Sequence, residues 1–310
     1  MAVRRVVVLI NPGSGVFAQT PEATLRATLE RALAKHGIAA RLVSASGDDL
    51  RAAADSALAE AQRGEIDAIV VGGGDGSVRL VAGVLAETGV PLGVVPLGTR
   101  NHFAKDLGMP LGLGAAVAAI ALGHTRAVDI AEVNGKTFIN TSSIGIYPYM
   151  VIDRERRRST GKLTKWRAMA LAFFRMLHHF PRRRLRLRAE GLARPYLTPC
   201  LFVGNNEHGI DLFAFGRRPR LDTGELWFYV LKPTNAWELF LTVCRLCFGH
   251  PDPERDLDTF KLREADIDAK ASRLPVALDG DVQILHPPLH YRSRQGALRV
   301  IAPVAQPRIR

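Results

Sequence analysis

The stretch from Ile66 to Gly108 constrains the fold of this chain more than any other part. An apolar run over residues 66–71 leads into the glycine-rich segment Gly72–Ser77, and a helical pattern of apolar residues follows it. A second apolar run, Pro91–Val95, leads into the segment Gly98–Asn101. Two successive strand–turn–helix units predict parallel strands whose loops lie at one edge of a sheet, where ligands of such folds bind.

The glycine-rich loop has the chemistry of a phosphate site. Glycines let the backbone come close to a ligand and adopt positive φ. A helix that begins near Gly76 directs its free N–H groups and the positive end of its dipole toward that place. Asp75 would repel a bare phosphate, so its presence predicts a metal ion or a reacting hydroxyl nearby. The loop lacks the Walker A lysine and the dinucleotide spacing, and a tight turn without a ligand is the alternative.

Four short motifs carry a resemblance to a known family. Gly73–Ser77 resembles the GGDGT loop of diacylglycerol, sphingosine and NAD kinases, and Gly98–Gly108 resembles the GTxN segment of the lipid-kinase branch, which NAD kinases lack. Asn11–Gly15 resembles the NPxSG motif of that branch, and Leu278–Asp281 resembles its DGE motif. The chain therefore resembles bacterial-type diacylglycerol kinase catalytic-domain proteins from residue 11 to residue 281.

The resemblance implies an ATP-dependent lipid kinase that uses magnesium and phosphorylates a hydroxyl of a diacylglycerol-like or sphingoid-like lipid. It implies that Asp279 is the general base and that Asp75 is a second acidic centre, linked to it through metal and water. Asp222 lies where relatives carry an acidic turn implicated in metal binding, although a hairpin turn explains it equally well. The candidates for holding phosphate and nucleotide are Asn11, Gly73, Gly74, Asp75, Gly76, Ser77, Gly98, Thr99 and Asn101; the alternative for these residues is plain capping and turn structure.

The sequence also departs from the family pattern. Ser77 replaces the usual Thr, and Asp281 replaces the usual Glu. Val16 stands where a basic residue is common, which puts one phosphate contact in doubt, and Arg100 and His102 are further departures. These changes leave the acceptor lipid open. They also keep a non-catalytic nucleotide- or lipid-binding regulator as an alternative; a soluble-metabolite kinase of the NAD kinase type is another, and the Gly98–Asn101 segment counts against it.

The order of predicted elements divides the chain into two domains. Alternating strands and helices over residues 1–125 predict a doubly wound parallel sheet, the α/β class. From residue 126 to 310 short strands dominate, with an Asn134-Gly135 hairpin signal, and predict an antiparallel β domain with helical insertions at 165–180 and 236–248. The resemblance implies that this domain is a β-sandwich and that the C-terminal tail returns to the first domain.

The positive charge of the chain is concentrated in one segment. The net charge is +12, and Arg154–Arg188 holds 13 basic residues against the single acid Glu155. Its predicted helix, residues 165–180, is amphipathic with basic ends, which is typical of binding to an anionic membrane surface. A core-facing helix with a solvated basic rim is the alternative. Nucleic acid ranks below lipid as a partner because the segment carries no recognised nucleic-acid motif.

Composition limits the cellular setting. Three cysteines argue against a disulfide framework and fit a reducing cytoplasm. No stretch reaches the roughly 18 apolar residues needed to span a bilayer, so we expect a cytoplasmic protein that is soluble or peripherally bound to membrane. The histidines show no spacing typical of a zinc site. The oligomeric state is open, and a homodimer is among the possible assemblies.

Overall fold

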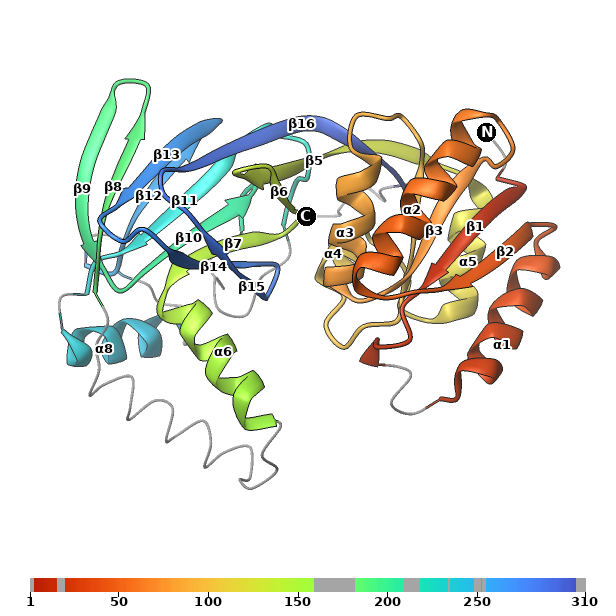
Figure 1. The fold of residues 1–310 in the computed structure, drawn as a ribbon, viewed down its shortest axis with the longest axis horizontal. Helices are drawn as coiled ribbons and strands as arrows, with labels where there is room; N and C mark the ends of the chain where they lie inside the picture. Colours follow the sequence, from red (N-terminus) through yellow and green to blue (C-terminus); the bar gives the residue numbers. More distant parts are fainter. Residues whose placement is uncertain are drawn as a thin grey trace. The chain divides into compact units, whose positions relative to one another are not determined.

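The chain forms two compact units. A computed structural model describes residues 3–15, 20–158, 182–208, 218–233, 235–247, 252 and 255–304 (Figure 1). The first unit comprises Met1–Ile130 with Arg294–Arg310, and the second comprises Ala131–Ser293. The expected boundary lay at residue 125. The division instead falls within two strands that run from one unit into the other, β5 (Thr125–Val133) and β16 (Leu289–Ile301).

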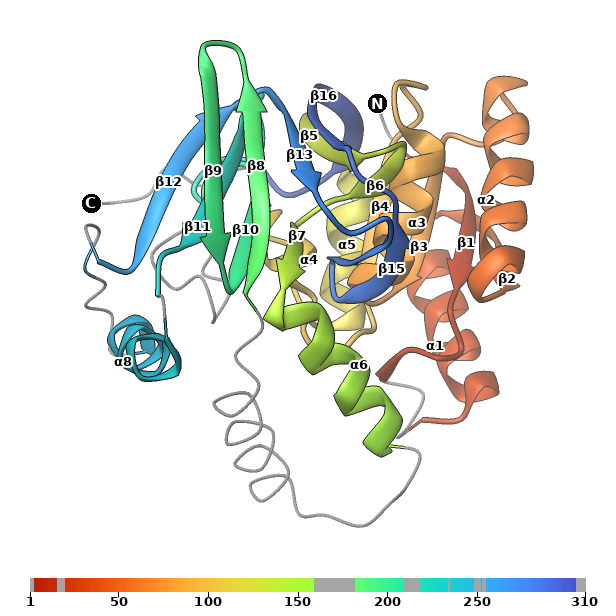
Figure 2. The same cartoon turned by 60° about the vertical axis from the view of Figure 1, so that its left-hand side comes forward.

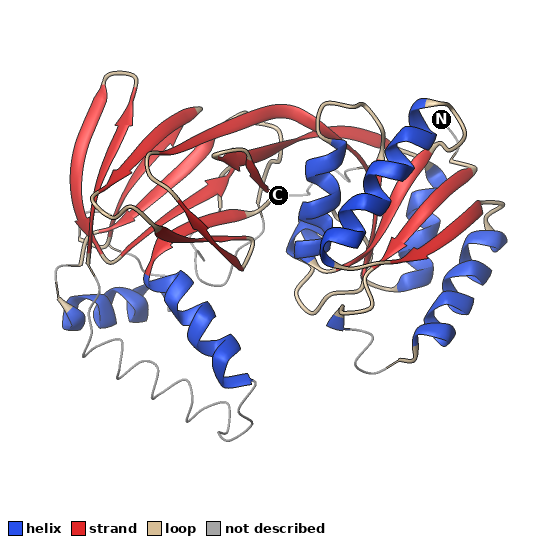
Figure 3. Cartoon of the chain, viewed as in Figure 1, coloured by secondary structure: helices blue, strands red, loops and turns tan. Residues whose placement is uncertain are grey.

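The first unit is a parallel sheet with helices on both faces (Figure 3). Its strands and helices are β1 (Arg5–Ile10), α1 (Glu22–Lys35), β2 (Ala39–Ser44), α2 (Gly47–Gln62), β3 (Ala68–Gly73), α3 (Asp75–Leu85), β4 (Leu92–Pro96), α4 (His102–Asp106) and α5 (Leu113–Leu122). The strands pair in the order β2-β1-β3-β4, and the end of β16 joins β4 in parallel at Val300. Helix α2 packs against α3, and α1 against α5. The predicted α/β class is confirmed.

The burial of these elements follows from their sequences. Every residue of β3 and β4 is buried, as expected for central strands covered on both faces. Helix α1 buries Leu25, Leu29 and Leu33 at helical spacing. Ser46 precedes α2, and Asp48 and Asp49 follow it at the start of the helix. Both acids lie in the first turn, where they favour the helix dipole.

The second unit is a sandwich of antiparallel sheets (Figure 2). Its elements are β6 (Lys136–Phe138), β7 (Thr141–Gly145), α6 (Ile146–Arg158), β8 (Arg183–Ala189), β9 (Leu192–Thr198), β10 (Cys200–Asn205), β11 (Leu226–Leu231), α8 (Ala236–Cys247), β12 (Leu257–Leu262), β13 (Glu264–Ala269), β14 (Leu274–Leu278) and β15 (Asp281–Leu285). One sheet has the order β16-β13-β8-β9, in which the start of β16 pairs with β13. The other sheet has the order β12-β11-β10-β7-β14-β15.

The core of this unit is aromatic at its centre. Tyr291 is fully buried and meets Phe138 and Phe228 edge to face, with ring centroids 6.2 and 5.9 Å apart. Its hydroxyl lies 3.0 Å from the Ser142 Oγ, so the buried polar group is satisfied. The antiparallel sandwich predicted for this part of the chain is confirmed.

Several short elements were not predicted from the sequence. They are α4, α6, β9, β12 and β15. Strand β9 contains Pro195, which weakens the strand pattern and is tolerated because β9 lies at a sheet edge. Strands β6 and β7 are separate because residues 139 and 140 leave the ladder between them. The predicted helix over 165–180 lies outside the described residues.

Helix α8 corresponds to the predicted insertion at 236–248. Its Leu239 packs with Phe202 and Tyr229 in a second apolar cluster. None of the helices within the described ranges combines the length and the apolar character needed to cross a bilayer.

A buried ion pair fastens α8 to the segment before β12. The Asp256 side chain is fully buried and accepts hydrogen bonds from Arg245, from the Thr242 hydroxyl at 2.6 Å and from the Asp252 N–H at 2.7 Å. Burial alone would raise the pKa of Asp256, but the bonds from Arg245, Thr242 and Asp252 together lower that pKa to about 2.

Replacing Asp256 with Asn should therefore flatten one part of the pH dependence of stability. The folded pKa lies below the unfolded value near 3.8, so the ionised carboxylate stabilises the fold fully above about pH 4 and loses this effect as the pH falls through about 2. We expect Asp256→Asn to cost about 2 kcal/mol of unfolding free energy at pH 5 and little at pH 2, measured by urea denaturation. Asp55→Asn, an exposed control on α2, should match wild type at both pH values; equal costs for Asp256→Asn at both would contradict this origin.

Candidate active site

Three loops meet at the carboxyl ends of β1, β3 and β4. A Cβ placed on Gly98 would lie 2.5 Å from the Gly74 Cα, so these two loops touch backbone to backbone. A Cβ on Gly15 would lie 2.5 Å from the Thr99 Cγ2. The Asn11 amide donates to the Ser77 Oγ at 2.8 Å. The structure thus brings together the predicted residues of all three loops.

The glycines of the second loop allow close approach, and the expectation of positive φ at this loop is wrong. Gly74 has φ −90°, and none of the other glycines of Gly72–Gly76 adopts positive φ. A Cβ on Gly73 would lie 2.6 Å from the Ser77 Cβ, and one on Gly72 would lie 3.0 Å from the Leu97 Cδ1. Side chains are excluded here by neighbouring atoms, and not by backbone strain.

The first loop contains a buried hydroxyl that the sequence interpretation did not single out. Ser14 is 8% exposed, and its Oγ has no hydrogen-bond partner among the described residues. It lies 3.6 Å from the position of a Cβ on Gly73, beside the glycine-rich loop. A buried, unsatisfied hydroxyl is costly unless a ligand or water completes it. The sequence signal was present, since Ser14 stands between Gly13 and Gly15 in the first motif.

Asp75 and Asn101 both hold the third loop in shape. The Asp75 carboxylate accepts the N–H groups of His102, at 3.2 Å, and Phe103, at 3.0 Å, at the start of α4. Asn101 has φ 51°, and its amide accepts from the Gly98 N–H at 2.9 Å and donates to the Gly98 carbonyl at 2.8 Å. The capping and turn roles considered for these residues are therefore present, and they fix the positions of both loops.

His102 is a close neighbour of the Asp75 carboxylate. Burial lowers the pKa of His102, and the Asp75 carboxylate opposes this effect while Arg100 and Lys105 add to it. The His102 imidazole is therefore neutral at neutral pH.

Asp279 occupies the two-residue turn between β14 and β15 in the second unit. Asp279 and Gly280 have φ 51° and 93°, the positive values that a tight hairpin turn requires. Its Oδ1 accepts the N–H groups of Asn140 and Thr141, at 2.7 and 3.0 Å, and its Oδ2 accepts that of Ile139 at 2.8 Å. The carboxylate is thus fixed by three backbone donors from the segment that separates β6 from β7.

A buried arginine holds the same segment from the other side. Arg218 is 3% exposed, and its guanidinium donates to the carbonyls of Ile139, at 2.7 Å, and Asn205, at 2.9 Å. It also donates to the Asn140 side-chain oxygen at 2.9 Å. The sequence interpretation missed Arg218 because a single arginine in a basic protein carries no periodic or motif signal.

Asp222, the predicted metal residue, lies in an exposed turn of the second unit. Its carboxylate pairs with Arg220 at 2.9 Å, and its side chain is 54% exposed. The next residue, Thr223, donates its N–H to Asn206 at 2.9 Å, which ties the turn to the end of β10. Within the described residues, His, Cys, Asp and Glu do not gather in groups of three or more that could hold a metal ion. Val16 lies outside the described residues.

Comparison with protein families identifies the first part of the chain. Residues 5–133 match the family model of the diacylglycerol kinase catalytic domain. A protein of Klebsiella pneumoniae (strain 342) named "Probable lipid kinase YegS-like" is 42% identical over 89 residues, which are 28% of this chain and 30% of that protein. The diacylglycerol kinase of Bacillus subtilis (strain 168) is 33% identical over 147 residues, 46% of each chain. The chain thus matches less than half of the length of these relatives.

A solved structure extends the likeness to the whole fold. The crystal structure of a diacylglycerol kinase from Bacillus anthracis str. Sterne superposes with a TM-score of 0.70 and 21% identity, over 97% of this chain and 98% of that one. The resemblance carried by the sequence motifs is confirmed. Residues 5–133 match the diacylglycerol kinase catalytic domain, and the chain as a whole shares the fold of that solved structure.

Proposed function

We propose that the protein is an ATP-dependent lipid kinase that transfers the γ-phosphoryl group to a hydroxyl of a diacylglycerol-like or sphingoid-like lipid. The observation that carries this proposal is the meeting of three loops in a domain of the diacylglycerol kinase family, with the buried Ser14 hydroxyl left without a partner among the described residues. Phosphoryl transfer depends on positioning and on neutralising charge, and this cluster of backbone amides and one carboxylate is suited to both.

The residues of the first unit fit a nucleotide and its metal. The unsatisfied Ser14 Oγ can donate to a phosphate oxygen, and the start of α3 presents backbone N–H groups beside it. Asp75 supplies one carboxylate, which suits Mg²⁺ because this ion usually binds one or two carboxylates together with phosphate oxygens and water. Bound magnesium would neutralise the charge of the phosphates during transfer. In the second unit, Asp222 is a separate candidate for a metal ligand.

Asp279 is the proposed general base for the lipid hydroxyl. A general base must be held within hydrogen-bond reach of the hydroxyl whose proton it accepts. Three backbone donors also fix the orientation of the group before substrate binds. Arg218 acts as a positioning residue, since it holds the carbonyls and Asn140 side chain of the segment whose N–H groups hold Asp279.

In this proposal the enzyme acts at a membrane surface, because the acceptor hydroxyl belongs to a lipid. A lipid with an exposed hydroxyl is presented by a bilayer, and the positive charge of Arg154–Arg188 suits an anionic surface. Residues 159–181 of that segment lie outside the described residues, while Arg182–Arg188 lie at and within β8.

Transfer of labelled γ-phosphate from ATP with magnesium to a total bacterial lipid extract tests the reaction directly. Separation by thin-layer chromatography should give a labelled lipid product. Labelled product in the aqueous phase would indicate a soluble acceptor, as for an NAD kinase. ATP binding without any labelled product would favour the non-catalytic regulator.

Asp279→Asn should keep ATP binding and lower turnover by about 10²-fold or more, because the amide cannot accept the hydroxyl proton. Initial rates with the labelled lipid product measure this. Near-normal turnover would exclude Asp279 as the base.

The variant Arg218→Lys distinguishes a role of Asp279 as base from a role in holding the segment 139–141. Arg218→Lys keeps a buried charge but loses the fork that bonds Ile139, Asn205 and Asn140, so it loosens the same segment. We expect Arg218→Lys to lower turnover by about tenfold or less and to keep the wild-type pH profile. If both variants lose the same turnover with the same pH profile, Asp279 acts by holding the segment and not as a base.

Gly98→Ala should separate the second and third loops, because the new Cβ would meet the Gly74 Cα at 2.5 Å. The expected cost is about 1–3 kcal/mol of unfolding free energy and at least tenfold weaker nucleotide binding. Urea denaturation and titration with a fluorescent ATP analogue measure these two effects. Gly114→Ala is the control, since a Cβ there meets nothing within 4 Å; unchanged nucleotide affinity in Gly98→Ala would mean that the loop contact does not shape the site.

A further inference from the structure

The pairing of β8 with β13 changes from opposite charges to like charges at one end. Asp266 lies opposite Arg188, and Asp268 opposite Arg186, with Arg188 also donating to Asp268 at 3.0 Å. The ladder ends at Ala269 opposite Leu185. In the same alternation the next facing positions are Lys270 and Arg184, both basic. Opposite charges across strands are stabilising and like charges are destabilising, so an anion bound at this end of the pair would be stabilising.

The other neighbour of Arg184 does not supply that anion. Strand β9 places Leu197 opposite Arg184 and Pro195 opposite Arg186. Arg184 is exposed, and Leu197 beside it is 45% exposed, so a cation and an apolar side chain stand together at the surface. No carboxylate lies within salt-bridge distance of Arg184 or Lys270 among the described residues.

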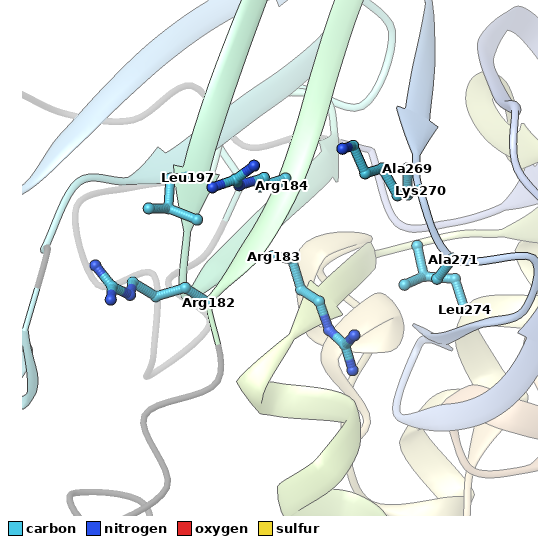
Figure 4. A pocket seen from close by; sticks show the side chains of 8 residues that line it. All are labelled: Arg182, Arg183, Arg184, Leu197, Ala269, Lys270, Ala271 and Leu274. Carbon is cyan, nitrogen blue, oxygen red and sulfur yellow. The ribbon is translucent and has the colours of Figure 1, made fainter.

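These residues line a groove of about 510 Å³ (Figure 4). Its lining includes Arg182, Arg183, Arg184 and Lys270 together with Leu197. Asp268 lines the adjoining groove, where it pairs with Arg188. Arg183 is oriented by Tyr149, to whose hydroxyl it donates and over whose ring it lies at 5.5 Å. Figure 4 shows Arg184 on β8, with its guanidinium directed toward Leu197, and Lys270 beside Ala269 at the end of β13. A volume of this order accommodates a phosphate with its glycerol group.

We propose that this groove binds the phosphate group of an anionic phospholipid, with Arg184 and Lys270 as its ligands and Leu197 beside the start of the acyl chains. The proposal rests on the proposed function, because a kinase of lipids meets such headgroups at the membrane. A bound phosphate oxygen would lie between two facing cations and convert their repulsion into two charge-assisted hydrogen bonds. The exposed Leu197 beside the cations favours a lipid over a free anion, because only an apolar group such as an acyl chain would remove its side chain from water.

Lys270→Asp tests the proposal, because it restores the alternation of charge set by Asp266 and Asp268. Without lipid, the variant should melt about 1–3 °C higher than wild type, as the repulsion becomes an attraction. Its affinity for phosphatidylcholine vesicles that contain about one third phosphatidylglycerol should fall at least tenfold, measured by co-sedimentation. Lys136→Asp is the control: it makes the same charge change at an exposed site on β6 in the same unit, outside the groove, and should cost about threefold or less.

The outcomes separate the groove from general attraction and from free phosphate. Equal losses in both variants, or no loss in Lys270→Asp, would overturn the proposal. Inorganic phosphate in the millimolar range is the soluble probe. If it raised the melting temperature of wild type but not of Lys270→Asp, while vesicle binding of the two was equal, the groove would bind free phosphate and the lipid assignment would be wrong.

The binding assay contains no nucleotide, so it is independent of turnover. Vesicle binding that depends on Lys270, in a protein that phosphorylates no lipid, would support the groove and count against the kinase proposal. Lipid phosphorylation by wild type together with equal vesicle binding of both variants would support the kinase and overturn the groove.

Discussion

The close contact between Gly74 and Gly98 is the constraint on which the candidate nucleotide site depends. With no side chain at either position, the loops after β3 and β4 touch through their backbones, and the loop after β1 is held to them by Asn11 and Ser77. Asp75 then reaches across to the start of α4 and fixes the third loop. A parallel sheet brings these loops to one edge, but only atoms as small as a glycine hydrogen let them pack together there.

In the second unit, two charged side chains hold a short backbone segment in place. The Asp279 carboxylate accepts hydrogen bonds from N–H groups of the short segment 139–141. The Arg218 guanidinium donates to the Ile139 carbonyl of the same segment. Both groups are bonded to backbone partners, and Ile139 at the start of the segment is fully buried. In the same unit Arg184 and Lys270 line one groove at the surface. The charged groups of the segment thus have partners within the chain, while the proposed partner of the groove is an added anion.

Much of the architecture follows from local pattern. Continuous apolar runs predict β3 and β4, helical spacing predicts α1 and α5, and the Asn134-Gly135 turn predicts the β5–β6 hairpin. The pattern fails for α6, β9 and β15, which are short or contain proline and form because neighbouring strands and helices complete their hydrogen bonds and cover their apolar faces. Arg218 illustrates the limit for side chains: its three acceptors lie far from it in sequence, and no spacing could indicate them.

The sequence by itself determined the class of the fold and the family that the first domain resembles, because hydrophobic period and glycine motifs are local features of the linear chain. Tertiary structure alone decided what each polar group contacts. It made Asn101 and Asp75 supports of a loop, left the Ser14 hydroxyl buried beside the glycine-rich turn, and placed Lys270 and Arg184 along one groove. Those contacts depend on strand register and loop packing, which join residues far apart in the sequence and therefore cannot be predicted from local sequence patterns.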